Sequence, residues 1–198
     1  MMNRRNILIA LPLAAGLLNW PQSVIAIDSA RAERLINALL QDINDVVYSS
    51  SSEASKTAEF KDIFRRYSDV SYIAAYVMGV EARRATKTQK AAFSQAFQSY
   101  IAKKYGKRFH EFTDGRLEVK DVRAVKRWYE VDTLAHLPNS QPLEITFFVS
   151  DRTGEDLFFN MFVGGINLLL NERAEVGALI DKNRGDIDAM IREIENLS

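Results

Sequence analysis

The sequence has no cysteine, and only two of its 198 residues are histidine. The absence of cysteine excludes disulfides, thiol redox chemistry and thiolate metal ligands. His110 and His136 lack the spacing of a metal site, so each is interpreted as a surface or helix-end histidine. The sequence therefore predicts neither a bound metal nor a cofactor.

Net charge and catalytic motifs are missing as well. The 26 basic residues balance the 26 acidic ones, so the chain lacks the basic excess of nucleic-acid-binding proteins. It contains no G-x-S-x-G elbow, no H-E-x-x-H helix and no Walker A loop. We therefore expect no nucleic-acid partner and no catalytic residues. Nothing in the sequence specifies oligomerisation, so a monomer is the default.

An apolar stretch near the N-terminus is typical of an export signal. Arg4 and Arg5 precede apolar residues 7–18, and Val24-Ile25-Ala26 fits a small-residue cleavage site. The stretch is shorter than the ~20 apolar residues that span a bilayer. We expect a signal peptide over residues 1–26, cleaved near Ala26, and a single periplasmic domain over residues 27–198. The paired arginines leave the Sec and twin-arginine routes both open.

The first half of the remaining chain has helical periodicity. Apolar residues recur at three- and four-residue steps in several segments, which predicts helices over residues 32–47, 60–67, 70–77 and from Thr86 towards His110. Ser68 or Asp69 can cap the third helix, and Gly79 can end it. Gly106 is a candidate kink in the fourth, because glycine is unfavourable inside a helix.

From Arg116 the period changes to two, which indicates strands. Strands are predicted over residues 117–119, 129–135, 143–149 and 157–163, the last with Leu157, Phe159, Met161 and Val163 on one face. Short turn-like connections at 138–140 and 151–154 indicate antiparallel neighbours. Two helices, over residues 168–180 and 187–194, complete an α+β fold in which helices cover one face of an antiparallel sheet of about four to five strands.

Two blocks of residues resemble the MlaC, or toluene-tolerance, family of periplasmic phospholipid-binding proteins. The first block is Gly79, Thr86, Thr88-Gln89, Phe93, Phe97, Ile101 and Tyr105. The second is Phe159, Val163-Gly164-Gly165-Ile166-Asn167-Leu168, Asn171 and Arg173. The resemblance covers most of the chain from about Leu35 onward. Gly164 stands where the family usually has an acidic residue, and Asn167 where it usually has serine.

The resemblance implies both an architecture and a function. The architecture is an NTF2-like cone, with a curved sheet and helices on its concave face. The function is that of a phospholipid carrier between an outer-membrane lipoprotein complex and an inner-membrane ABC transporter complex, which maintains the lipid asymmetry of the outer membrane. Any energy input would come from the transporter, because this sequence has no nucleotide site.

A lipid carrier needs an apolar interior. A diacyl lipid exposes ~30 methylenes, each worth ~0.8 kcal/mol when buried, so its chains require a dry cavity. The candidate lipid-binding residues are Phe64, Tyr67, Ile73, Val77, Phe93, Phe97, Ile101, Tyr105, Phe147, Val149, Phe159 and Met161. Each of these could equally belong to a solid core. Arg173 is the candidate contact to a headgroup phosphate or a partner, with a structural ion pair as the alternative.

Two other classes of function stay open. An enzyme on the same fold could act on a small hydrophobic substrate with Asp132 or Glu130 as its base, which predicts a buried acid with a raised pKa. A non-catalytic envelope adaptor would have a filled core and bind no lipid. The basic residues Lys103, Lys104, Lys107 and Arg108 are either a solvated helix face or a docking site for an acidic partner or anionic headgroups.

Overall fold

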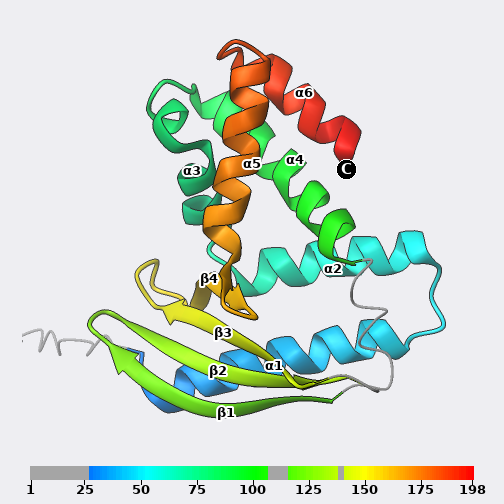
Figure 1. The fold of residues 1–198 in the computed structure, drawn as a ribbon, viewed down its shortest axis with the longest axis vertical. Helices are drawn as coiled ribbons and strands as arrows, with labels where there is room; N and C mark the ends of the chain where they lie inside the picture. The colour runs from blue at the N-terminus through cyan, green and yellow to red at the C-terminus, as the bar shows by residue number, and fades with distance from the viewer. Residues whose placement is uncertain (1–26, 107–115, 138–140) are drawn as a thin grey trace, which may run out of the picture.

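The computed structural model describes residues 27–106, 116–137 and 141–198 (Figure 1). Helices come first, then a sheet, then helices again, in the order that the sequence predicts. The first group comprises α1 (Ser29–Tyr48), α2 (Glu53–Tyr67), α3 (Val70–Met78), the 3-10 helix η1 (Gly79–Arg83) and α4 (Lys87–Gly106). The last two helices are α5 (Leu168–Lys182) and α6 (Ile187–Leu197).

Side-chain caps fix the helix boundaries. Asp69, rather than Ser68, caps α3 by accepting a hydrogen bond from the Tyr72 amide at 2.9 Å. At the start of α4, the Thr86 hydroxyl accepts from the Gln89 amide and the Gln89 side chain accepts from the Thr86 amide, which is a reciprocal capping pair. These contacts confirm Thr86 as the predicted helix start. The predicted extension of this helix to His110 lies outside the described residues.

The sheet is an antiparallel meander. Its strands are β1 (Arg116–Val125), β2 (Trp128–His136), β3 (Leu143–Ser150), β4 (Leu157–Val163) and β5 (Ile166–Asn167), in spatial order β1-β2-β3-β4-β5. The four predicted strands are confirmed. β5 was not predicted, because two residues are too few to show an alternating pattern. Gly164 and Gly165 both have positive φ and make the turn into β5, which explains the glycine pair.

A β-bulge in β4 corrects one prediction about its faces. Val149 pairs with Phe158 and Phe148 pairs with Asn160, which leaves Phe159 as an extra residue. Phe158, at 5% exposure, therefore joins the buried side, whereas strict alternation had assigned Phe159 to it. The Phe159 ring instead makes edge contacts with Trp128, Phe148 and Tyr72.

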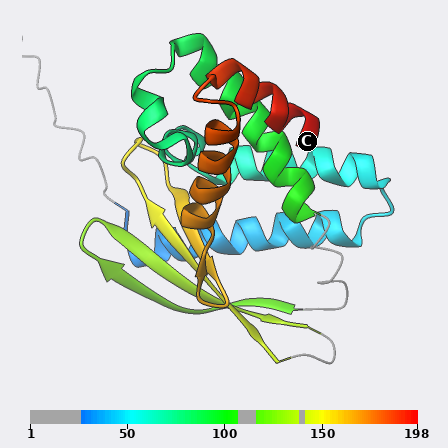
Figure 2. The same cartoon turned by 45° about the horizontal axis from the view of Figure 1, so that its top comes forward.

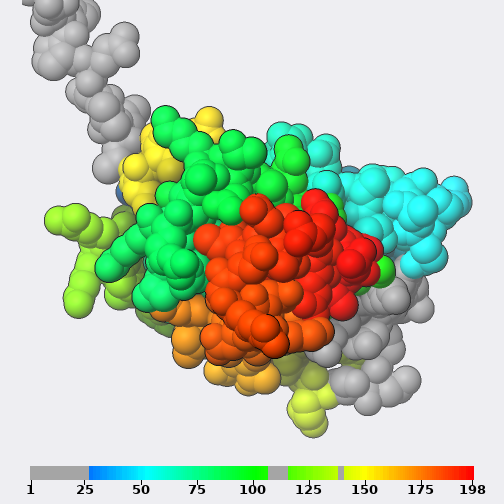
Figure 3. Space-filling view, turned by 90° about the horizontal axis from the view of Figure 1, so that it is seen from above, coloured from blue at the N-terminus to red at the C-terminus, as the bar shows by residue number. Residues whose placement is uncertain are grey.

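The helices lie against one side of the sheet. Figures 1 and 2 show α1 running alongside β1, β2 and β3, with α2 beyond it and α3, α4, α5 and α6 gathered at the other end of the molecule. Viewed from that end, α5 and α6 lie side by side on the surface (Figure 3). The junction of α2 and α3 touches the sheet directly, because the Asp69 amide donates to the Phe158 carbonyl at 2.8 Å. The result is an α+β fold with a curved five-stranded antiparallel sheet.

Candidate functional site

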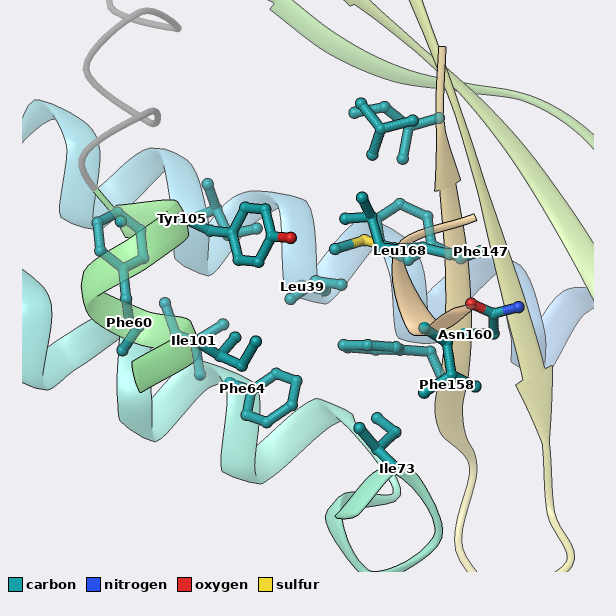
Figure 4. A pocket seen from close by; sticks show the side chains of 18 of the residues that line it. Leu39, Phe60, Phe64, Ile73, Ile101, Tyr105, Phe147, Phe158, Asn160 and Leu168 are labelled. Atoms are coloured by element: carbon teal, nitrogen blue, oxygen red, sulfur yellow. The ribbon is translucent and has the colours of Figure 1, made fainter. Parts of the chain in front are cut away.

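A cavity of about 260 Å³ lies between the helices and the sheet (Figure 4). A void needs only ~10–15 Å³ to hold one water molecule, so this space is far larger than a packing defect. Its walls are apolar side chains from α1, α2, α3, α4 and α5 on the helical side and from β1, β3 and β4 on the sheet side. This cavity argues against the adaptor hypothesis, which requires a filled core.

Many of the predicted lipid-binding residues lie in the cavity wall. These are Phe64, Ile73, Phe97, Ile101, Tyr105, Phe147 and Met161. Phe159 also borders the cavity, but the bulge turns its ring towards Trp128 and Phe148. Figure 4 shows Phe64, Ile73, Ile101 and Tyr105 on the helical side, facing Phe147 across the space. Segments far apart in the sequence thus supply the two sides of one apolar space.

The other predicted residues do not line the cavity. Val77, Phe93 and Val149 are no more than 1% exposed and are packed among core side chains. Tyr67 turns its hydroxyl to Asp42 Oδ2, at 2.7 Å. Periodicity identifies the inward face of an element, but it does not say whether another side chain or a void lies opposite each residue.

Several wall residues were missed by sequence reasoning. From α1 come Leu39, Leu40 and Ile43, from α2 Phe60 and Ile63, from β4 Phe158, and from α5 Leu168, Leu169 and Glu172. The helical pattern of α1 was visible in the sequence, but its position along the sheet was not. Phe158 was missed because the bulge changes the face on which it lies, and no residue type in β4 indicates that bulge.

Arg173 lies away from the cavity, at the contact between α5 and the end of α3. It donates from Nη1 to the Tyr76 carbonyl at 3.3 Å, and its guanidinium lies 4.9 Å from the centre of the Tyr76 ring. A Cβ on Gly79 would stand 3.3 Å from Arg173 Nη2. Gly79, at φ +60°, therefore provides both the turn after α3 and the space for this side chain. Arg173 fastens two helices through a carbonyl and a ring, rather than through an acidic side chain.

Glu172 is the one charged residue among the described residues of the cavity wall. It is only 3% exposed. Its Oε1 accepts hydrogen bonds from Lys104 Nζ, at 2.7 Å, and from the Tyr105 hydroxyl. Burial and the neighbouring Glu172 carboxylate raise the pKa of Tyr105, so its hydroxyl keeps its proton.

The contacts of Glu172 continue to the protein surface. Lys104 Nζ also bonds to Glu175 Oε2 at 2.7 Å and to the Tyr100 hydroxyl at 2.9 Å. Burial lowers the pKa of Lys104, but its hydrogen bonds to Glu172 and Glu175 outweigh that effect and the net shift is upward. Lys104 is therefore a permanent cation that joins α4 to two acids of α5.

The predicted basic cluster on α4 is partly accounted for by these contacts. Lys103 donates to the Ser198 carbonyl at 2.7 Å, and Lys104 is held by Glu172 and Glu175. Lys107 and Arg108 lie outside the described residues. The two described members thus make intramolecular contacts, in place of a free cationic face.

The candidate catalytic acids do not lie in the cavity wall. Asp132 and Glu130 both bind Arg123, and Asp132 Oδ1 also accepts from the Thr146 hydroxyl at 2.6 Å. Neither carboxylate is buried. The described residues also contain no group of three or more potential ligands placed to hold a metal ion. Neither of the two acids that the enzyme hypothesis names therefore lies beside the cavity.

An α+β fold that keeps a large apolar space between its sheet and its helices defines a class of proteins that hold a hydrophobic ligand. The particular family follows from the sequence: the family model described as MlaC protein matches residues 33–196, and the chain belongs to the MlaC family. A search of curated proteins finds no match. In the described ranges, no helix has the length and apolar character needed to cross a bilayer.

A solved structure shares the fold. It is a phospholipid-binding protein from Ralstonia solanacearum in complex with a phospholipid, with a TM-score of 0.72 and 14% sequence identity. The match covers 84% of this chain and 96% of that one. At this identity the similarity concerns the arrangement of helices and strands.

Proposed function

We propose that this protein is a periplasmic phospholipid carrier that holds the acyl chains in its apolar cavity. The cavity of about 260 Å³ is the observation that carries the proposal, because its walls are almost entirely hydrocarbon. Membership of the MlaC family supports it. So does the similarity to a protein whose structure was solved with a phospholipid bound.

The physical task of a lipid carrier explains why this cavity is apolar. Acyl chains are poorly soluble in water, since each exposed methylene costs ~0.8 kcal/mol. A cavity as apolar as the membrane interior compensates for that cost, so transfer between membrane and carrier is close to balanced and therefore reversible. A headgroup near the surface keeps its hydration, which would be expensive to remove. No bond is made or broken, and no catalytic group is needed.

The proposal extends to the place and partners of the carrier. Residues 1–26 would direct export and be removed near Ala26, and residues 27–198 would form one phospholipid-binding domain with an NTF2-like cone. The carrier would exchange lipid with an outer-membrane lipoprotein complex and an inner-membrane ABC transporter complex, and so maintain outer-membrane lipid asymmetry. It would do so as a monomer.

The test is native mass spectrometry of the protein purified from its periplasm without detergent, followed by lipid extraction. We expect a one-to-one adduct with the mass of a phospholipid. A folded protein that carries no lipid, and takes none up from vesicles, would reject the carrier function and favour an adaptor or an enzyme.

A further inference from the structure

Some polar atoms of the cavity wall have hydrogen-bond partners, and others have none. Among the described residues that line it, the polar side chains are those of Tyr105, Asn160 and Glu172. The Tyr105 hydroxyl donates a hydrogen bond to Glu172 Oε1. Asn160 Oδ1 and Glu172 Oε2 are buried and meet no donor from the described part of the chain. Both unpartnered atoms are hydrogen-bond acceptors.

An unpartnered acceptor at the wall of an apolar cavity indicates that the ligand carries a hydrogen-bond donor. A buried carboxylate oxygen without a donor is costly, and a ligand that supplies the donor recovers that cost. Glu172 is held in place for this role, because Lys104 and Tyr105 both fix its other oxygen. Tyr105 lies on the helical side of the cavity and Asn160 on the strand side (Figure 4). Asn160 pairs with Phe148, whereas Phe147 of the cavity wall pairs with Met161, so the Asn160 amide lies on the other face of the strand. Glu172 Oε2 is therefore the unpartnered acceptor on which the argument depends.

The charge of the residues around Glu172 indicates which kind of donor group the ligand carries. Lys104 contributes one positive charge, and Glu172 and Glu175 contribute two negative ones, so this network has a net charge of −1. A phosphate is an anion with acceptor oxygens only, and it would be repelled by Glu172. An ammonium group brings both the opposite charge and N–H donors, which makes a strong hydrogen bond to a carboxylate.

The network also lies where a headgroup can reach it. Its Lys104 side chain is 27% exposed and that of Glu175 is 45% exposed, whereas that of Glu172 is 4% exposed. The contacts thus lead from the cavity wall to the surface between α4 and α5. A lipid can place its ammonium at Glu172 while its phosphate stays hydrated.

We propose that the cavity selects phospholipids whose headgroup carries an N–H ammonium, and that Glu172 Oε2 accepts a hydrogen bond from it. The inference rests on the proposed carrier function and names the ligand class of the same site. Phosphatidylethanolamine has this group. Phosphatidylcholine has the same charge and phosphate, but its trimethylammonium has no N–H to donate.

The test is a competition between these two lipids with identical acyl chains. Delipidated protein is incubated with equimolar mixed vesicles, and the bound lipid is quantified by mass spectrometry. We expect the wild type to retain phosphatidylethanolamine about tenfold over phosphatidylcholine, the ratio that one charge-assisted hydrogen bond commonly supplies. Glu172→Gln should bring the ratio close to one. Glu193→Gln removes the same charge from α6, where Glu193 pairs with Lys182 and lies outside the cavity wall, and should keep the preference.

Different failures have different meanings. A wild type that binds both lipids equally, or a preference that survives Glu172→Gln, would overturn the ammonium site and leave the carrier function intact. Retention of phosphatidylglycerol as strong as that of phosphatidylethanolamine would also overturn it, because that lipid donates from hydroxyls and has no ammonium. A folded wild type that binds no lipid would instead reject the carrier function.

A second measurement needs no variant, in case Glu172→Gln does not fold. The wild-type protein loaded with phosphatidylethanolamine is treated with a water-soluble amine-reactive reagent. We expect the bound lipid to react at least tenfold more slowly than the same lipid in vesicles, because its ammonium is engaged by Glu172. Equal reaction rates would overturn the proposal.

Discussion

Phe147 is the residue through which the cavity can be tested most directly. Its side chain is 4% exposed and forms part of the wall on β3. We expect Phe147→Asp to abolish lipid retention, because a carboxylate there would place an unpaired charge among acyl chains. Bound lipid is measured by mass spectrometry and folding by circular dichroism.

Phe162→Asp is the matched control for that substitution. Phe162 belongs to the neighbouring strand, stacks on Phe148 at 5.3 Å between ring centres, and does not line the cavity. The control protein should keep its lipid. If a folded Phe147→Asp protein retained lipid as well as the control does, β3 would not be part of the binding site.

At the residue scale, the sequence predicted which faces point inward. It did not predict which residues on those faces line the cavity and which are packed in the solid core. Phe93 and Phe97 lie on the same predicted face of α4 and stack at 5.5 Å, yet Phe97 reaches the cavity and Phe93 does not. The difference depends on what packs opposite each ring, which is a property of the folded molecule. The role of Glu172 could not be predicted either, because its partner Lys104 lies on a helix 68 residues earlier in the chain.

At the element scale, local chemistry set most boundaries. Asn167 caps α5 by accepting from the Leu170 amide at 3.1 Å, and asparagine is among the residues preferred at this position. The predicted helices and the four longer strands are confirmed because caps and periodicity are local signals. The bulge at Phe159 was not predictable in this way, because it is set by pairing with β3.

Asp69 joins three elements and gives a prediction at this scale. It caps α3, and its Oδ2 accepts from Arg152 Nε in the turn between β3 and β4, at 2.8 Å. We expect Asp69→Ala to lower the free energy of unfolding by about 2 kcal/mol, through loss of the cap and of a buried acceptor. Urea denaturation measures the change.

Asp69→Asn separates the two roles of this side chain. Asparagine is an equally good N-cap, so this variant should lose only the ion pair with Arg152 and cost less than Asp69→Ala. Equal losses for the two variants would mean that the ion pair, and not the cap, stabilises this junction.

For the whole molecule, the cavity makes stability depend on its contents. Lipid that binds the folded state alone adds about 2.7 kcal/mol at a free concentration one hundred times its dissociation constant. For a chain of this length, we expect loading to raise Tm by about 5–10 °C. Scanning calorimetry of delipidated and reloaded protein measures the shift. Phe147→Asp should show none, and an unchanged Tm in wild type with lipid demonstrably bound would argue against burial of the chains.

The start of the described chain has a consequence for how the protein matures. The Ile27 amide donates to Asp151 Oδ2 at 2.8 Å, one residue before the Asp28 cap of α1. In the precursor this nitrogen belongs to a neutral peptide bond. Cleavage after Ala26 would turn it into an α-amino group, which has a pKa of ~7.7–8.0 and is mostly protonated at neutral pH. The same two atoms would then form an ion pair, and the act of processing would itself tighten the tether between the new terminus and the β3–β4 turn.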